Sequence, residues 1–196
     1  MKSSYQAKTI HFKLQNFAFY FLLLALSGLL SACGLNNVRK LDSTAAVGPD
    51  RSIIIYGIRV EGKWDAPMFS VNLDEYDLQL QGITGNCFRF NRAEAMIPST
   101  EKSTHYFAFE VHQGHFVVSP FTNADLSIST MAFKTQKGKA VYIGTFLYDK
   151  NKKLKLQRDF ALVAPQLENL FPRFRNNLKD SELIEVTRAR MFLCTP

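Results

Sequence analysis

Between residue 52 and the C-terminus, apolar residues alternate with polar ones in short segments, and a period of two is typical of β-strands. In residues 153–156, for example, lysines alternate with leucines. Turns rich in Gly, Pro, Asn or Lys separate these segments at intervals of roughly 10–14 residues, as in antiparallel sandwiches and barrels. The pattern predicts a mainly β fold, an antiparallel β-sandwich, with strand segments at 53–56, 76–81, 87–90, 105–111, 116–118, 126–128, 140–147, 153–156 and 187–194.

One segment near the C-terminus has helical spacing instead. Asp159 is placed to cap its N-terminus, Pro165 is assigned to the first turn, where proline is tolerated, and Pro172 ends it. Its apolar residues are Leu162, Val163, Leu167, Leu170 and Phe171. We therefore expect a single short C-terminal helix beside the sheets.

The first 32 residues have the composition of a targeting segment. Residues 1–16 contain lysines and no acidic residue, and the apolar run 17–30 is interrupted only by Ser27 and Gly28. A helix of that length spans about 21 Å, which is shorter than the roughly 30 Å hydrocarbon core of a bilayer. The segment is therefore typical of a signal peptide, and a short N-terminal anchor helix is the alternative.

This segment ends in Leu30-Ser31-Ala32-Cys33, which resembles the lipobox of bacterial lipoproteins. The resemblance implies cleavage before Cys33, whose thiol then carries a diacylglycerol and whose amine carries a third acyl chain. Two or three chains hold a protein stably on a bilayer, at about 0.8 kcal/mol per buried methylene. Residue 34 is Gly and not the Asp that retains enterobacterial lipoproteins at the inner membrane. The resemblance therefore implies the outer membrane, with the protein facing the periplasm.

These features divide the chain into a signal peptide, 1–32, a lipidated tether, 33–51, and a single folded domain, 52–196. The tether is polar, rich in small residues and broken by Gly48-Pro49. Removal of the three lysines in the signal peptide lowers the formal net charge from +7 to +4. Such a mild surplus is compatible with anionic lipid or polysaccharide as a partner and does not indicate nucleic acid.

Two further segments resemble small bacterial lipoproteins with transthyretin-like or immunoglobulin-like sandwiches. Tyr106–Phe116 (YFAFEVHQGHF) resembles their strand, glycine turn and strand, and Lys137–Thr145 (KGKAVYIGT) resembles their Gly-x-x-x-Tyr-Ile-Gly strand. A short helix that ends in Phe-Pro, as Leu170-Phe171-Pro172 does here, commonly follows in that group. The resemblance spans roughly residues 104–172 and implies a fold rather than an activity, because its motifs are structural.

Residues with catalytic or metal-binding chemistry are few. The sequence contains no Gly-x-Ser-x-Gly, His-Glu-x-x-His, phosphate-loop or dinucleotide motif. His112 and His115 would face each other across a two-residue turn and could share a metal, but no third ligand is evident, and exposed turn residues are the simpler interpretation. The acidic residues in 74–77 are interpreted as a solvated strand entry rather than a cation site. We predict no catalytic residue, no metal and no cofactor.

The largest charge cluster is basic and contains Lys150, Lys152, Lys153, Lys155 and Arg158. Lys152, Lys153 and Lys155 are candidates for contact with lipid head groups or with an anionic polysaccharide of the envelope. The alternative is a solvated hairpin whose lysines protect a sheet edge from pairing with another chain.

Once Cys33 carries lipid, Cys87 and Cys194 are the two remaining thiols, and the periplasm is oxidising. Each lies on the polar side of its predicted strand, Cys87 with Arg89 and Cys194 with Arg190. We therefore predict a disulfide between them, which requires the last strand to run near the strand of Cys87. Two separate thiols are the alternative.

Two classes of function remain. The first is a membrane-tethered, non-catalytic protein that binds or scaffolds an envelope protein or an anionic polysaccharide. The second is a periplasmic, hydrolase-like enzyme whose site has no recognisable motif. The sequence shows no nucleophile–base pair, which favours the first. Convergence of His112, His115 and an acidic side chain in one concave pocket would favour the second.

Overall fold

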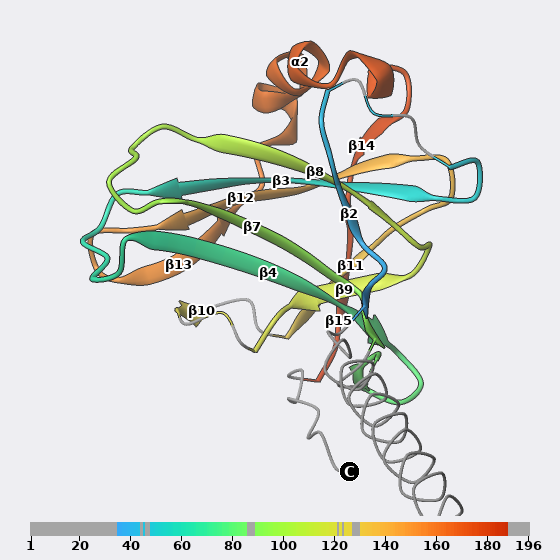
Figure 1. Ribbon diagram of the computed structural model, residues 1–196, viewed down its shortest axis with the longest axis horizontal. Helices are drawn as coiled ribbons and strands as arrows, with labels where there is room; N and C mark the ends of the chain where they lie inside the picture. Colours follow the sequence, from blue (N-terminus) through green and yellow to red (C-terminus); the bar gives the residue numbers. More distant parts are fainter. Residues whose placement is uncertain are drawn as a thin grey trace, which may run out of the picture. The chain divides into compact units, whose positions relative to one another are not determined.

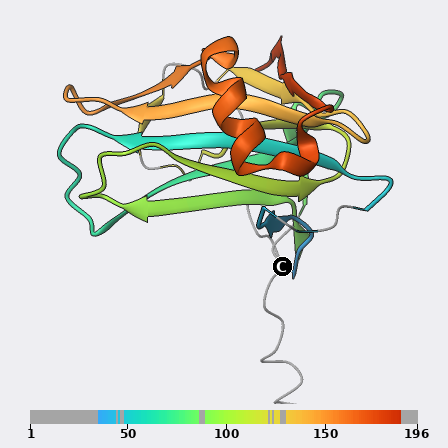
Figure 2. The same cartoon turned by 90° about the horizontal axis from the view of Figure 1, so that it is seen from above.

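The computed structural model describes residues 35–43, 45, 48–85, 89–120, 122, 124–126 and 130–187. Within these ranges the chain is mainly strand, with one α-helix, α2 (Phe160–Leu170), and one short 3-10 helix, η1 (Pro172–Phe174). Two sheets pack face to face, and α2 lies on the outer face of one of them (Figure 1 and Figure 2). No helix in the described ranges is both long and apolar enough to span a membrane. The predicted mainly β fold with one short C-terminal helix is confirmed.

The larger sheet has seven strands. Six lie in the order β10–β13–β12–β3–β8–β2, and β14 pairs with the first part of β12. The central strands β3 and β12 have nine residues each and are buried almost throughout. The strand bounds are β2 (Arg39–Leu41), β3 (Ser52–Val60), β8 (His105–Val111), β10 (Asp125–Leu126), β12 (Ala140–Tyr148), β13 (Lys153–Gln157) and β14 (Leu178–Asp180).

The smaller sheet has six strands, and their pairs are antiparallel. Five lie in the order β15–β11–β9–β4–β5, and β7 pairs with the first part of β4. Two short strands precede β2 and β7, namely β1 (Leu35–Asn36) and β6 (Arg89–Phe90). The bounds of the sheet are β4 (Met68–Asp77), β5 (Gly82–Ile83), β7 (Arg92–Pro98), β9 (His115–Val118), β11 (Met131–Lys134) and β15 (Glu182–Glu185).

The main core lies between the two sheets. Ile54, Tyr56 and Ile58 of β3 belong to the same buried cluster as Phe69 and Val71 of β4. The Tyr56 hydroxyl donates to the backbone oxygen of Val71 at 2.9 Å, so the polar group at the centre of this core has a partner in the opposite sheet. The fully buried Tyr56 therefore links the sheets by a hydrogen bond as well as by packing.

Strand β3 is apolar on both faces because both faces are covered. Ile53 and Ile55 point to the outer face, where they pack with Leu167 of α2. A strand buried on both sides is expected to be a continuous apolar run, which explains the sequence Ile53–Tyr56. Strand β12 lies parallel to β3, with Ala140 beside Ile53, so the larger sheet is mixed and not purely antiparallel. The chain between β3 and β12 forms much of the smaller sheet, and this long connection allows β12 to run parallel to β3.

The folded unit begins at Asn36, earlier than the domain boundary expected at residue 52. Asn37 N donates to Phe90 O at 3.1 Å, and β2 then pairs antiparallel with β8. Leu41 is buried beside Ile53 and the helix. Part of the expected tether is therefore a strand of the sheet, because the edge of β8 offers it hydrogen bonds and Leu41 gains a buried position.

Two local expectations differ from the structure. The predicted strand 76–81 ends at Asp77, whose carboxylate accepts hydrogen bonds from the backbone N–H groups of Gln79 (2.7 Å) and Leu80 (2.9 Å) and so closes a turn. Pro165 lies inside α2 and not in its first turn, because the helix begins at Phe160. Asp159 occupies the N-cap position but its side chain makes no capping hydrogen bond.

Candidate functional site

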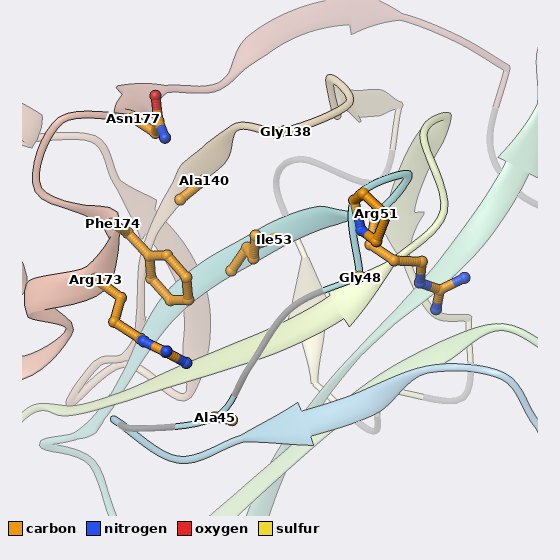
Figure 3. Close-up of a pocket in the computed structure, with 10 residues that line it drawn as sticks. Ala45, Gly48, Arg51, Ile53, Gly138, Ala140, Arg173, Phe174 and Asn177 are labelled. Carbon is orange, nitrogen blue, oxygen red and sulfur yellow. The ribbon is translucent and has the colours of Figure 1, made fainter.

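A pocket of about 330 Å³ lies where η1 meets the starts of β3 and β12 (Figure 3). Ile53, Ala140 and the ring of Phe174 form its apolar floor, and Arg51 and Arg173 line its sides. This volume is at the lower end of the range for small-molecule sites. The N-terminal segment, the larger sheet and the C-terminal helical region all contribute residues to the pocket, which makes it the candidate functional site.

The floor of the pocket follows from strand register. Ile53 and Ala140 are partners in the parallel pair of β3 and β12, and both lie on the face that α2 and η1 cover. Ala140 is small, so its position leaves space above the sheet. Ala140 N donates to Asn177 O at 3.1 Å and thereby holds the turn after η1 against the strand. Pro172 at the start of η1 directs the chain so that Phe174 packs over this position.

One side of the pocket is held by a buried carboxylate. Glu110 of β8 is 7% exposed and accepts hydrogen bonds from Arg39 Nε at 3.0 Å and from Gly48 N at 3.2 Å. Arg51 Nε lies 3.3 Å from the same carboxylate. Burial by itself raises the pKa of Glu110, but these hydrogen bonds and the charges of Arg39 and Arg51 outweigh it and hold the pKa below its ordinary value. Glu110 therefore stays ionised and fixes the loop that carries Gly48 and Arg51.

The two arginines of the pocket have different orientations. The Arg51 guanidinium points away from the floor in Figure 3, in keeping with its contacts to Glu110 and to the backbone oxygen of Asn37 (2.9 Å). The Arg173 side chain extends beside Phe174. A guanidinium presents several hydrogen-bond donors in one plane and suits carboxylate or phosphate groups. The pocket therefore combines an apolar floor with a cation at its side, which suits an anionic group carried by a small apolar body.

The two histidines of the predicted turn do not converge. His112 is exposed, whereas His115 lines a separate hollow with Glu75 and Asp77. Partial burial and the charge of Lys134 lower the pKa of His115, so its imidazole is neutral at neutral pH. Within the described ranges, no group of three or more His, Cys, Asp or Glu side chains is placed to hold a metal ion.

The acidic segment 74–77 has structural contacts instead of a solvated position. Asp74 is 1% exposed and lies opposite Arg92 in the pair of β4 and β7. Arg92 Nε and Nη2 donate to its two carboxylate oxygens at 2.7 and 3.2 Å. The Glu75 carboxylate accepts from Thr84 Oγ1 at 2.7 Å and from Asn91 Nδ2. The interpretation of Asp74 as part of a solvated strand entry is wrong, because a cross-strand arginine compensates its burial.

The basic hairpin lies at the far ends of β12 and β13 from the pocket. Lys152 and Lys153 are exposed, and Lys152 adopts a positive φ of 61° in the turn. Lys155 Nζ lies 2.7 Å from Asp149 Oδ2. This hydrogen bond from Lys155, together with backbone N–H groups, lowers the pKa of Asp149. Contact of these lysines with an anionic surface stays a prediction.

The cysteine predictions concern residues whose placement is not described. Cys33, Cys87 and Cys194 all lie outside the described residues, and so do residues 188–194 of the predicted strand 187–194. Lipid attachment at Cys33 and the disulfide between Cys87 and Cys194 therefore stay predictions.

Comparison with families of proteins, with curated proteins and with solved structures found no match to this chain.

The pocket residues were not found by sequence reasoning. They come from the segments 45–53, 138–140 and 173–177, which no local motif connects. One sequence feature does point to the pocket. In the run Phe171-Pro172-Arg173-Phe174, directly after the helix, a basic residue lies between apolar residues. Glu110 gives a second signal. An aromatic-rich strand is expected to be buried, and a carboxylate buried within it needs a hydrogen-bonding or charged partner.

Proposed function

We propose that this protein is a lipid-anchored, non-catalytic binding protein of the cell envelope. Its acylated Cys33 holds it on the outer membrane, and its folded unit faces the periplasm. The basic, apolar and small-residue order that ends in Leu30-Ser31-Ala32-Cys33 supports the anchor. Mass spectrometry of the mature N-terminus tests this part directly, and an unmodified chain that begins at Met1, or cleavage elsewhere, would contradict it.

The pocket between η1 and the larger sheet carries the binding part of the proposal. Its floor of Ile53, Ala140 and Phe174 excludes a strongly hydrated ligand, and Arg173 beside the floor favours a negative charge. The ligand class is therefore an anionic group on a short apolar body, as an envelope protein would present. The fixed position of the 48–51 loop, through Glu110, gives the site a preformed shape.

Titration calorimetry of the full chain with hexanoate and with hexan-1-ol tests this assignment. We expect hexanoate to bind at least about tenfold more tightly, because one charge-assisted hydrogen bond contributes about 1.5 kcal/mol. Arg173→Gln should reduce the binding of hexanoate to that of the alcohol. Arg175→Gln is the matched control, since Arg175 is also exposed but lies outside the pocket, with its Nε 3.9 Å from Glu168. Equal effects of the two substitutions would overturn the assignment.

A hydrolase-like enzyme is the second candidate, and the hollow that His115, Glu75 and Asp77 share is the observation in its favour. Both carboxylates in this hollow hold other groups in place. Glu75 accepts from Thr84 and Asn91, and Asp77 closes the turn that follows β4. We therefore favour the binding protein. Hydrolysis of an ester or glycoside substrate that His115→Ala abolishes, in a variant that keeps the wild-type melting temperature, would reverse this choice.

We further infer that Cys87 and Cys194 form a disulfide, because they are the remaining thiols once Cys33 is acylated in an oxidising compartment. The bond would close a loop of about 108 residues and contribute about 4–5 kcal/mol in the chain-entropy description. Thiol titration of the unfolded, unreduced protein should find no free thiol. Two reactive thiols would contradict the bond.

A further inference from the structure

The covalent distance between the proposed lipid and the folded unit is short. Cys33 and Asn36 are three residues apart, and a fully extended chain spans at most about 3.6 Å per residue. The folded unit begins at Asn36 and not at residue 52. An acylated Cys33 therefore lies within about 11 Å of Asn36 along the chain, instead of at the end of an 18-residue tether.

Asn36 and Asn37 are held by residues 90–92, which lead into β7 of the smaller sheet, so this short distance cannot lengthen without loss of these contacts. Asn36 Nδ2 donates to Arg92 O at 2.8 Å, and Arg92 N donates back to Asn36 Oδ1 at 3.1 Å. Asn37 N donates to Phe90 O at 3.1 Å, and Asn37 Nδ2 donates to Asn91 Oδ1 at 3.0 Å. Four hydrogen bonds thus tie the start of the folded unit to residues 90–92.

The same end of the folded unit carries an exposed apolar turn. Asn91 contacts Glu75 through its side chain, and β4 continues from Glu75 to Asp77 before the turn 78–81. Leu80 in this turn is 81% exposed. In Figure 1, α2 lies on the opposite side of the folded unit from the end of β4 that leads into this turn. The turn is therefore an exposed apolar feature of the folded unit that this path of contacts links to residues 36–37.

We propose that the 78–81 turn, with Leu80 at its surface, rests on the phospholipid bilayer that holds the acyl chains of Cys33. The proposal depends on the lipid anchor given above and adds an orientation and a contact surface to it. The short covalent reach brings this end of the folded unit to the head groups, where an exposed leucine gains from leaving water. The helix α2 then faces away from the bilayer.

Quenching by brominated lipids tests the orientation in the full, lipidated chain. Leu80→Trp and Leu162→Trp are prepared in a Trp64→Phe background and reconstituted into vesicles of brominated phosphatidylcholine. Leu162 on α2 is the matched control, because it is also 81% exposed. We expect at least twofold stronger quenching of the Leu80→Trp protein than of the Leu162→Trp protein. Equal quenching, or no quenching of the Leu80→Trp protein on the vesicles, would overturn the proposal.

A linker insertion separates the effect of chain length from a general affinity for lipid. Fifteen Gly and Ser residues placed between Cys33 and Asn36 should reduce the quenching of the Leu80→Trp protein to that of the control. Quenching that persists would contradict the argument from covalent reach. Failure of the anchor itself is recognised separately, because an unacylated Cys33 is visible by mass spectrometry and the protein does not float with vesicles.

Discussion

Asn36 and Arg92 form a reciprocal pair in which the Asn36 side chain takes the place of a neighbouring strand. The Asn36 amide donates to Arg92 O at 2.8 Å and accepts from Arg92 N at 3.1 Å. Three residues later the same segment leaves this sheet and pairs with β8 of the larger sheet. The start of the folded unit therefore connects the two sheets, with Asn36 attached to one and Leu41 buried against the other.

The first prediction concerns this pair. Asn36→Ala removes these two hydrogen bonds and a third, from Val38 N to Asn36 Oδ1 at 3.1 Å. We expect the free energy of unfolding to fall by about 1–2 kcal/mol, since each exposed bond contributes about 0.5 kcal/mol or slightly more. Urea unfolding measures the change. Asn151→Ala is the control, because Asn151 lies exposed in the basic turn and donates to Asp149 Oδ1 through its backbone N–H, which alanine keeps. Equal stability of the Asn36→Ala protein and the wild type would show that the segment is held by Leu41 and β2 alone.

Glu110 gives a prediction for acid stability. Its pKa in the folded protein is lowered from 4.5, so its ionised form stabilises the fold above the ordinary glutamate pKa, and this contribution is lost as the pH falls through the folded pKa. Glu110→Gln leaves Arg39 and Arg51 without the carboxylate and should cost about 2 kcal/mol at pH 7. Unfolding experiments at pH 7 and below pH 4 should show that the difference between wild type and variant shrinks in acid. A difference that stays constant with pH would contradict the role of the charge.

Gly144 gives a prediction for the larger sheet. Its φ is +140°, and a Cβ atom there would lie 2.5 Å from Leu156 Cδ1 and 2.8 Å from the backbone oxygen of Gln157. Gly144→Ala should therefore lower the free energy of unfolding by about 3 kcal/mol or more, through both backbone strain and overpacking. Gly138→Ala is the matched control, because its φ is +71° but nothing lies within 4 Å of the added atom, and about 1 kcal/mol is expected. Equal losses would show that the close contact is relieved at no cost.

The sequence predicted the strands whose side chains alternate strongly. Residues 153–156, where lysines alternate with leucines, lie within β13, and the aromatic-rich residues 105–111 coincide with β8. Strand β7 was missed, since its inward residues Ala93 and Ala95 are small and contribute little to an apolar pattern. Strand β2 was missed because a short, basic strand on a sheet edge has the composition of a linker.

The pocket was not predictable for a related reason. Ile53 and Ala140 meet through a parallel strand pair that joins distant parts of the chain, and Phe174 reaches them only after the helix has packed. The spacing of residues within one segment does not indicate which distant segments of the chain come together. Asp74 shows the same limit, because its buried position depends on Arg92 across the sheet. Paired charges of this kind are visible only once the register is known.

The last prediction concerns the basic hairpin, where the structure separates the three lysines. If the hairpin contacts an anionic envelope surface, the full chain should bind lipopolysaccharide in a way that weakens as salt is raised, and each lysine near the surface contributes about 1 kcal/mol. Lys152 and Lys153 are exposed, whereas Lys155 already lies 2.7 Å from the Asp149 carboxylate. We therefore expect Lys152→Gln together with Lys153→Gln to remove most of the binding. Lys155→Gln alone should remove less of it and should lower stability in its place, since Asp149 then loses its partner. Binding that all three substitutions leave unchanged, or that is absent in the wild type, would support the alternative in which these lysines only solvate the hairpin.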